Sequence, residues 1–203
     1  MGILDELYAR YPQLKNCESA IAGAFSLLGD CYRIGGKVLT CGNGGSAADA
    51  EHIVGELMKK FRRHREVERA VAEKLPPELT AKLEGALPAM SLVSMSGILT
   101  AFANDVAWET AFAQQVLGLG NKGDVLITLS TSGNSLNCVN AALVAKAKGM
   151  KVIAFTGKGG GRLAAVADVT IAVPESETYK IQELHLPVYH ALCAAIEERQ
   201  CNS

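Results

Sequence analysis

The chain has 203 residues, 49% of them hydrophobic and 20% charged, a composition typical of a globular protein with one sizeable core. Its formal net charge of −1 gives no electrostatic basis for general binding to nucleic acid or to an anionic membrane, so we expect neither as a partner. No apolar run approaches the roughly 20 residues that span a bilayer.

The first 35 residues are expected to form one or two helices, because apolar side chains recur there at helical spacing. Pro12 marks a helix start or a break within this segment. The segment carries acidic residues and lacks the long apolar core of a secretory signal. The six cysteines are scattered without CxxC pairs, which indicates reduced thiols and a cytoplasmic protein.

Five short segments are nearly continuous in Val, Ile, Leu and Ala, which is the pattern of strands covered on both faces. Segments with helical spacing lie between them and after them. This order predicts an α/β fold, with a five-stranded parallel sheet flanked by helices on both faces. The strands are expected at 37–41, 89–93, 124–130, 151–157 and 169–174, and the helices at 45–60, 106–118, 135–149 and 180–200.

Residues 59–88 differ from the rest of the chain because they are highly charged and contain the pair Pro76-Pro77. They predict two short exposed helices joined at the prolines. We expect a single domain over residues 1–203, with an insertion at 62–88. Both a solvated surface insertion and a lid or interface element fit this composition.

Two of the predicted strand-to-helix junctions carry glycine-containing, hydroxyl-bearing loops, CGNGGS at 41–46 and STSGNS at 130–135. A helix N-terminus exposes unpaired N–H groups and a partial positive charge, and glycine lets the backbone approach a ligand closely. Hydroxyl groups add further donors without adding charge. The loops therefore predict a phosphate site, and the alternative is that they are only caps and turns.

Together, the motifs CGNGGSAADAEH, LSTSGNS and IQELH with a later histidine resemble sugar isomerase (SIS) domains, and among them the phosphoheptose isomerases. The resemblance covers nearly the whole chain apart from roughly residues 62–88. It implies a five-stranded parallel sheet and a homotetramer with active sites between subunits. It also implies a phosphosugar substrate, with residues that hold the phosphate (Ser46, Ser130, Thr131, Ser132 and Ser135), shape the loop (Asn43 and Gly45) or lie near the sugar (Asn104 and Asp105). For Asn104 and Asp105 a helix cap before Val106 is the alternative.

His52 and Glu56 lie four residues apart, which places them on one face of the predicted helix, about one turn in from the first loop. The resemblance implies that Glu56 is the catalytic base and that His190 is the acid. It further implies one divalent metal per site, zinc, held by His52, Glu56, Gln182 and His190. His185 competes with His190 for the catalytic role, and Pro187 between them can kink the helix.

The implied reaction is conversion of sedoheptulose 7-phosphate into a heptose 7-phosphate through an enediol, a ketose–aldose isomerisation that needs a base and an acid. One alternative is an isomerase or sensor for another phosphosugar. Lys60, Tyr179 and the insertion depart from the family pattern and keep that alternative open. A second is a non-catalytic SIS protein that binds the bacterial replication initiator, although the presence of both Glu56 and His190 favours an enzyme.

Overall fold

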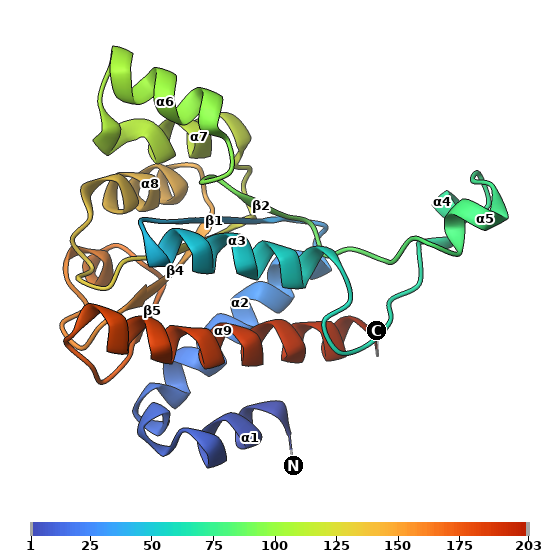
Figure 1. The fold of residues 1–203 in the computed structure, drawn as a ribbon, viewed down its shortest axis with the longest axis horizontal. Coiled ribbons are helices and arrows are strands. Elements are labelled where there is room, and N and C mark those ends of the chain that lie inside the picture. Colours follow the sequence, from blue (N-terminus) through green and yellow to red (C-terminus); the bar gives the residue numbers. More distant parts are fainter. Residues whose placement is uncertain (1, 202–203) are drawn as a thin grey trace.

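The computed structural model describes residues 2–201 and has a five-stranded parallel sheet between two layers of helices (Figure 1). The strand order is β2-β1-β3-β4-β5, so the chain moves outward from the centre of the sheet in both directions. The predicted α/β architecture is confirmed. The strands are β1 Val38–Gly42, β2 Ala89–Ser91, β3 Val125–Leu129, β4 Lys151–Thr156 and β5 Val169–Ala172.

Alternating side chains of the strands face two separate hydrophobic clusters, because successive residues of a strand point to opposite faces of a sheet. Val125, Ile127 and Leu129 contribute to one cluster. Leu126 contributes to the other cluster, on the opposite face. Figure 1 shows the corresponding layers, which comprise α1 Ile3–Arg10, α2 Glu18–Arg33, α3 Gly45–Met58 and α9 Thr178–Cys201 on one side, and α6 Ser96–Asp105, α7 Ala111–Leu119 and α8 Leu136–Ala147 on the other.

Within residues 2–201, three 3-10 turns lie between these elements: η1 Pro12–Cys17, η2 Trp108–Thr110 and η3 Arg162–Ala165. Pro12 begins η1 and so separates two helices, as the sequence predicted. α9 runs through Pro187 as one continuous helix. In the described range 2–201 no helix has both the length and the apolar character needed to cross a membrane.

The helix predicted at 106–118 is wrong at its start, because α7 begins only at Ala111. Ala107 is extended and is followed by η2, so the helical period does not begin before this turn. The preceding helix α6 was not predicted, and Asn104 and Asp105 form its last turn. The alternative of a cap before Val106 is therefore wrong, because these residues end one helix and do not begin another.

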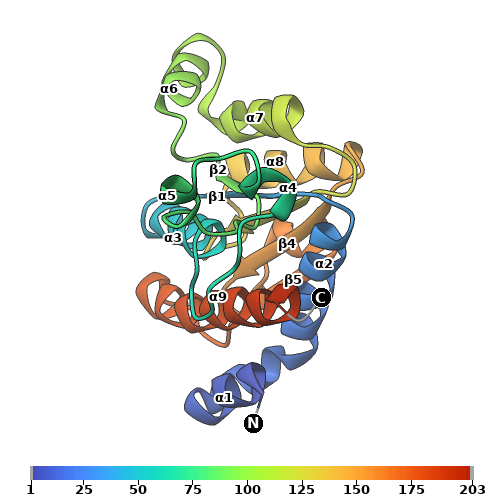
Figure 2. The ribbon, with the colours of Figure 1, turned by 90° about the vertical axis from the view of Figure 1, so that its right-hand side faces the viewer.

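The charged segment forms an arm that projects from the domain, as Figures 1 and 2 show. It contains α4 Arg69–Ala72 and α5 Pro77–Thr80, and neither short helix has a buried residue. The expectation of two short exposed helices is confirmed. The base of the arm differs from its tip, because the guanidinium of Arg65 is buried against α9 and the end of α3.

Candidate functional site

The two hydroxyl-bearing loops lie side by side, because they follow neighbouring parallel strands. Gly42 at the end of β1 pairs with Leu129 at the end of β3. The amides of Asn43 and Asn137 then join the first loop to the first turn of α8 with two hydrogen bonds, of 2.9 and 2.8 Å. Asn43 thus holds the two loops together, and its side chain is committed to that contact.

The hydroxyl groups of the second loop are not used as helix caps. Ser130 Oγ and Ser135 Oγ share a 2.9 Å hydrogen bond, and Ser132 Oγ accepts one from the backbone of Asn134 at 3.1 Å. Neither α3 nor α8 has a side-chain hydrogen bond at its N-cap. In the first turn of α8 the N–H of Cys138 donates to Asn137 Oδ1 at 3.0 Å, and in α3 the N–H of Ser46 donates to the carbonyl oxygen of Asn43 at 3.1 Å. The other N–H groups at the start of both helices have no side-chain partner among residues 2–201, an arrangement that favours an anion at a helix N-terminus.

Close packing requires a glycine at one position in these loops and brings a side chain against a second glycine. Gly133 has a φ of 66°, and a Cβ added there would lie 2.1 Å from the carbonyl oxygen of Gly160. A Cβ on Gly45 would lie 2.7–2.9 Å from the amide of Gln182. The structure thus places Gln182, from the first turns of α9, directly against the first loop.

His52 and Glu56 lie on one face of α3, as predicted, but further along the helix than one turn. α3 begins at Gly45, so the two residues lie about two and three turns into it. His52 Nε2 lies 3.1 Å from Glu56 Oε1, and Lys59 Nζ donates to Glu56 Oε2 at 3.0 Å. The Glu56 side chain is only 12% exposed, and Lys59 holds one of its oxygens.

His190, not His185, lies beside these groups. The rings of His190 and His52 are 4.9 Å apart between centroids, and Phe61 lies 5.4 Å away on another side. The His190 Nε2 atom is buried and has no hydrogen-bond partner among residues 2–201. Burial, followed by the neighbouring His52, lowers the pKa of His190, while Glu56 opposes this shift.

His185 is fully buried below the carboxyl end of β4, where its Nε2 lies 3.2 Å from the carbonyl oxygen of Thr156. Burial lowers the pKa of His185 to about 4, although the hydrogen bond to Thr156 opposes the shift. Its ring also packs edge-on against Phe155, at 5.4 Å between centroids. This histidine is therefore part of the core.

The structure adds Asp49 and Tyr189 to the site, two residues that the sequence reasoning missed. Tyr189 Oη lies 2.9 Å from His52 Nδ1 and donates to Asp49 Oδ1 at 3.1 Å. Asp49 could have been found, because its spacing to His52 and Glu56 puts it on the same helical face. Tyr189 lies 140 residues away, and only the packing of α9 on α3 brings it there.

Asn104 and Asp105 are not brought to these residues. Both are exposed at the end of α6, in the helical layer on the opposite face of the sheet from α9 (Figure 1). The Asn104 amide donates to the Asp105 carboxylate at 2.8 Å. Within residues 2–201, no hydrogen bond joins either of them to another candidate residue.

The donor atoms near His52 suit a divalent metal in their chemistry. Two imidazoles and a carboxylate are acceptable zinc ligands, and His190 Nε2, which has no hydrogen-bond partner among the described residues, fits such a role. The Gln182 amide lies instead beside Gly45, about 10 Å along α3 from His52. The 3.1 Å between His52 Nε2 and Glu56 Oε1 is close to the about 3.3 Å between two ligand atoms of tetrahedral zinc with bonds of about 2.0 Å. Over residues 2–201, however, no three His, Cys, Asp or Glu side chains are arranged together as a metal site.

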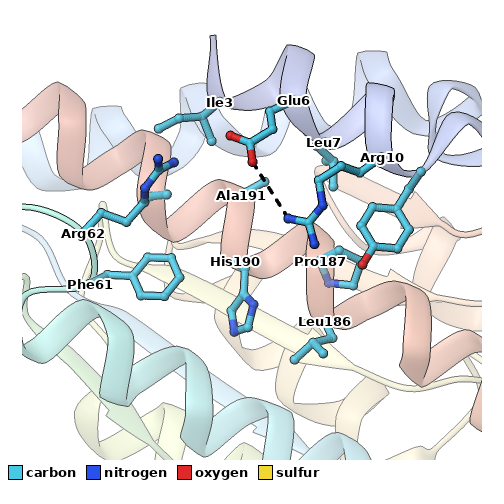
Figure 3. Close-up of a pocket in the computed structure, with 12 residues that line it drawn as sticks. Ile3, Glu6, Leu7, Arg10, Phe61, Arg62, Leu186, Pro187, His190 and Ala191 are labelled. Carbon is cyan, nitrogen blue, oxygen red and sulfur yellow. Dashed lines mark ion pairs between the residues drawn. The ribbon is translucent and has the colours of Figure 1, made fainter. Parts of the chain in front are cut away.

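A cavity of about 360 Å³ lies beside His190, between α1, α9 and the segment that follows α3. Figure 3 shows Phe61 and Leu186 flanking the imidazole, with an ion pair between Glu6 and Arg10 on α1. His52, Glu56 and the two loops do not line this cavity. It is separate from the groups that could hold a phosphate.

Comparison with known proteins gives one consistent result. A sequence model described as "SIS domain" matches residues 4–85 and 78–157. A phosphoheptose isomerase of Rhodospirillum rubrum is 41% identical over 190 residues, which cover 94% of this chain and 91% of that protein.

Two solved structures support the same comparison. The phosphoheptose isomerase GmhA of Neisseria gonorrhoeae superposes with a TM-score of 0.74 and 33% identity, covering 96% of this chain and 98% of that one. A phosphoheptose isomerase of Francisella tularensis superposes with a TM-score of 0.75 and 32% identity, covering 98% of this chain and 100% of that one.

Proposed function

The chain belongs to the SIS domain family and, within it, to the phosphoheptose isomerases, and we propose that it converts sedoheptulose 7-phosphate into a heptose 7-phosphate. It is an aldose–ketose phosphosugar isomerase, which moves a proton between adjacent carbons through an enediol. The observation that carries the proposal is that one helix, α3, has a phosphate-suited loop at its N-terminus and the pair His52 and Glu56 further along.

Phosphate binding is proposed for the two loops that precede α3 and α8. The buried hydroxyls of Ser46 and Ser130, the hydroxyl of Ser135 and the uncapped N–H groups provide donors without a charged side chain. Ser46 and Glu56 are ten residues apart, about 15 Å along a helix axis, so a long sugar phosphate suits the site better than a triose phosphate. Binding at the phosphate then positions the reacting carbons.

Proton transfer is proposed for Glu56 and His190. The Glu56 carboxylate takes the proton from the carbon next to the carbonyl, and it is held for this by Lys59. The lowered pKa of His190 keeps its ring neutral near pH 7, so that it can accept a proton from a hydroxyl and return it to the carbonyl oxygen. Phe61 packs against this ring and excludes water from one side.

One divalent metal per site, zinc, is part of the proposal and would be held by His52, Glu56, Gln182 and His190. When bound, it would polarise the carbonyl oxygen of the sugar as a Lewis acid.

We also propose a homotetramer with active sites between subunits. A cytoplasmic location is proposed because all six cysteines are free and five of them are buried.

A direct assay tests the proposed reaction. Purified protein is incubated with sedoheptulose 7-phosphate, and formation of the aldose is followed with and without a chelator. Glu56→Gln keeps the shape of the side chain but removes its basicity, so kcat should fall about 10²–10⁴-fold while binding of the sugar phosphate persists. Unchanged turnover in this variant would remove Glu56 from the mechanism.

A result with no turnover on any phosphosugar, together with tight binding of the replication initiator, would instead support the non-catalytic alternative. Turnover of a different phosphosugar, with sedoheptulose 7-phosphate left unchanged, would support the alternative of an isomerase for another phosphosugar. His52 contacts both Glu56 and His190, and the presence of these two groups at one site favours the phosphoheptose isomerase over both alternatives.

A further inference from the structure

The hydrogen bonds around His52 form a chain from Asp49 on α3 through Tyr189 on α9 and back to α3. Tyr189 Oη lies between Asp49 Oδ1, at 3.1 Å, and His52 Nδ1, at 2.9 Å. The other ring nitrogen of His52 faces the site carboxylate at 3.1 Å. The phenol has a single proton, so the direction of the whole chain depends on which neighbour receives it.

The surroundings of Asp49 decide that direction. An ionised carboxylate can only accept hydrogen bonds, and in the described part of the chain nothing donates to the buried Asp49 Oδ2. If Tyr189 donated to His52, two acceptor oxygens would face each other at 3.1 Å and the carboxylate would lose its hydrogen bond. An unsatisfied buried acceptor is costly, so the phenol proton belongs on the Asp49 side.

The phenol hydroxyl therefore donates along the 3.1 Å contact to Asp49 Oδ1. The hydroxyl proton is committed to Asp49, so the oxygen of Tyr189 can only accept from the imidazole. His52 must then carry a proton on Nδ1. In the neutral ring this leaves a lone pair on Nε2.

We propose that Tyr189, held by Asp49, fixes the proton of His52 on Nδ1 and so turns the lone pair of Nε2 toward the site carboxylate. Tyr189 and Asp49 are thus positioning residues that act through His52. Two acceptor atoms then face each other at 3.1 Å, which costs less here than at Asp49, because the contact is exposed and the Glu56 carboxylate still accepts a hydrogen bond from Lys59. A metal cation between the two atoms would stabilise this arrangement. The importance of this orientation for a metal rests on the proposed function, whereas the position of the proton does not.

The position of the proton can be read directly by ¹⁵N NMR. The metal-free, substrate-free protein is labelled at its four histidines and measured above pH 8, where the shifts and couplings of each ring show which nitrogen carries hydrogen. We expect a proton on His52 Nδ1. A neutral ring with its proton on Nε2 would overturn the proposal, whether or not the protein turns over sedoheptulose 7-phosphate.

Tyr189→Phe tests the role of the hydroxyl. The variant keeps the ring that packs against His52 and His190 but leaves Glu56 as the hydrogen-bond partner of His52. The proton should therefore move to Nε2, and the affinity of the metal-free protein for zinc, measured against a chromophoric chelator, should fall about 10–100-fold. An unchanged position of the proton in the folded variant would contradict the proposal.

Tyr32→Phe is the matched control, because Tyr32 is a buried phenol that donates to the carbonyl oxygen of Pro88 away from the site. It should leave the His52 signals and the zinc affinity unchanged. If both variants weaken zinc binding equally and neither moves the proton, Tyr189 has only a structural role. Should Tyr189→Phe fail to fold, the wild-type spectrum still decides the proposal.

Discussion

At the scale of single residues, close packing and burial determine which side chains belong to the site. The amide end of Gln182 fills the space where a Cβ on Gly45 would lie, so a side chain at this position would displace it. His185 and His190 are five residues apart on one helix, yet one is sealed in the core and the other borders the site. Each difference leads to a measurable prediction.

Gly45→Ala should impair the site more than the fold. The added Cβ would come within 2.9 Å of the Gln182 amide and push it from the first loop. We expect kcat/KM on sedoheptulose 7-phosphate to fall at least about 10-fold, because small displacements in a positioned site are costly. Gly55→Ala is the control on the same helix, since nothing lies within 4 Å of its added Cβ. It should keep activity and gain about 0.5–1 kcal/mol of stability.

Burial of neutral His185 should make stability depend on pH. The pKa of this group is about 4 in the folded protein and 6.5 as its ordinary value, so the unfolded chain binds more protons between these limits. The free energy of unfolding should therefore fall as pH drops from 6.5 toward 4, by up to about 3 kcal/mol from this group.

Chemical denaturation across this pH range measures the effect. His185→Gln cannot titrate but retains a donor for the Thr156 carbonyl, so the difference between wild type and variant should narrow as the pH falls. A difference in stability that is the same at pH 4.5 and pH 7 would contradict this account of His185.

At the scale of elements, the base of the charged arm is anchored by one buried ion pair. Arg65 Nη1 contacts Glu197 Oε1 at 2.7 Å, and the same carboxylate accepts backbone hydrogen bonds from residues 61–63. Arg65 also donates to the carbonyl oxygens of Leu57, Lys59 and Gly85. This network of hydrogen bonds, called the clamp below, therefore fixes the end of α3 and the segment that contains Phe61 against α9. His190 lies on the same helix.

Glu197→Gln should break this clamp. Removing one partner of a buried ion pair typically costs about 3–5 kcal/mol, because the remaining charge is left uncompensated. Urea unfolding should show a loss of this size, and hydrogen exchange should increase in residues 59–65. Glu198→Gln is the matched control, since this neighbour forms only a surface pair with Arg63 and should change stability by less than about 0.5 kcal/mol. Equal effects of the two changes would show that the clamp is not the anchor.

At the scale of the whole molecule, the layer formed by α6, α7 and α8 leaves large apolar side chains in contact with solvent. They include Val106, Trp108, Leu117, Leu136 and Leu143. In the proposed tetramer, a neighbouring subunit would cover these apolar side chains. Light scattering should give a particle of four times the mass of one chain. A monomer at micromolar concentration would contradict the tetramer.

The sequence predicted most of this architecture because buried parallel strands and helix periods are local signals. All five strands, the helices α3, α8 and α9 and the two short helices of the arm could be read in this way. The turn at η2 was missed because no glycine or proline marks it. Tyr189 could not be found, since its place at the site arises from the contact between α3 and α9, which are far apart in the chain.

The central claim is that the two loops hold the phosphate while Glu56 faces the carbonyl end of the sugar. A crystal structure of Glu56→Gln with sedoheptulose 7-phosphate tests it most directly. We expect the phosphoryl group within hydrogen-bond distance of Ser130 and Ser135 and the first N–H groups of α3, with the two reacting carbons beside residue 56. A phosphoryl group bound away from both loops would contradict the account.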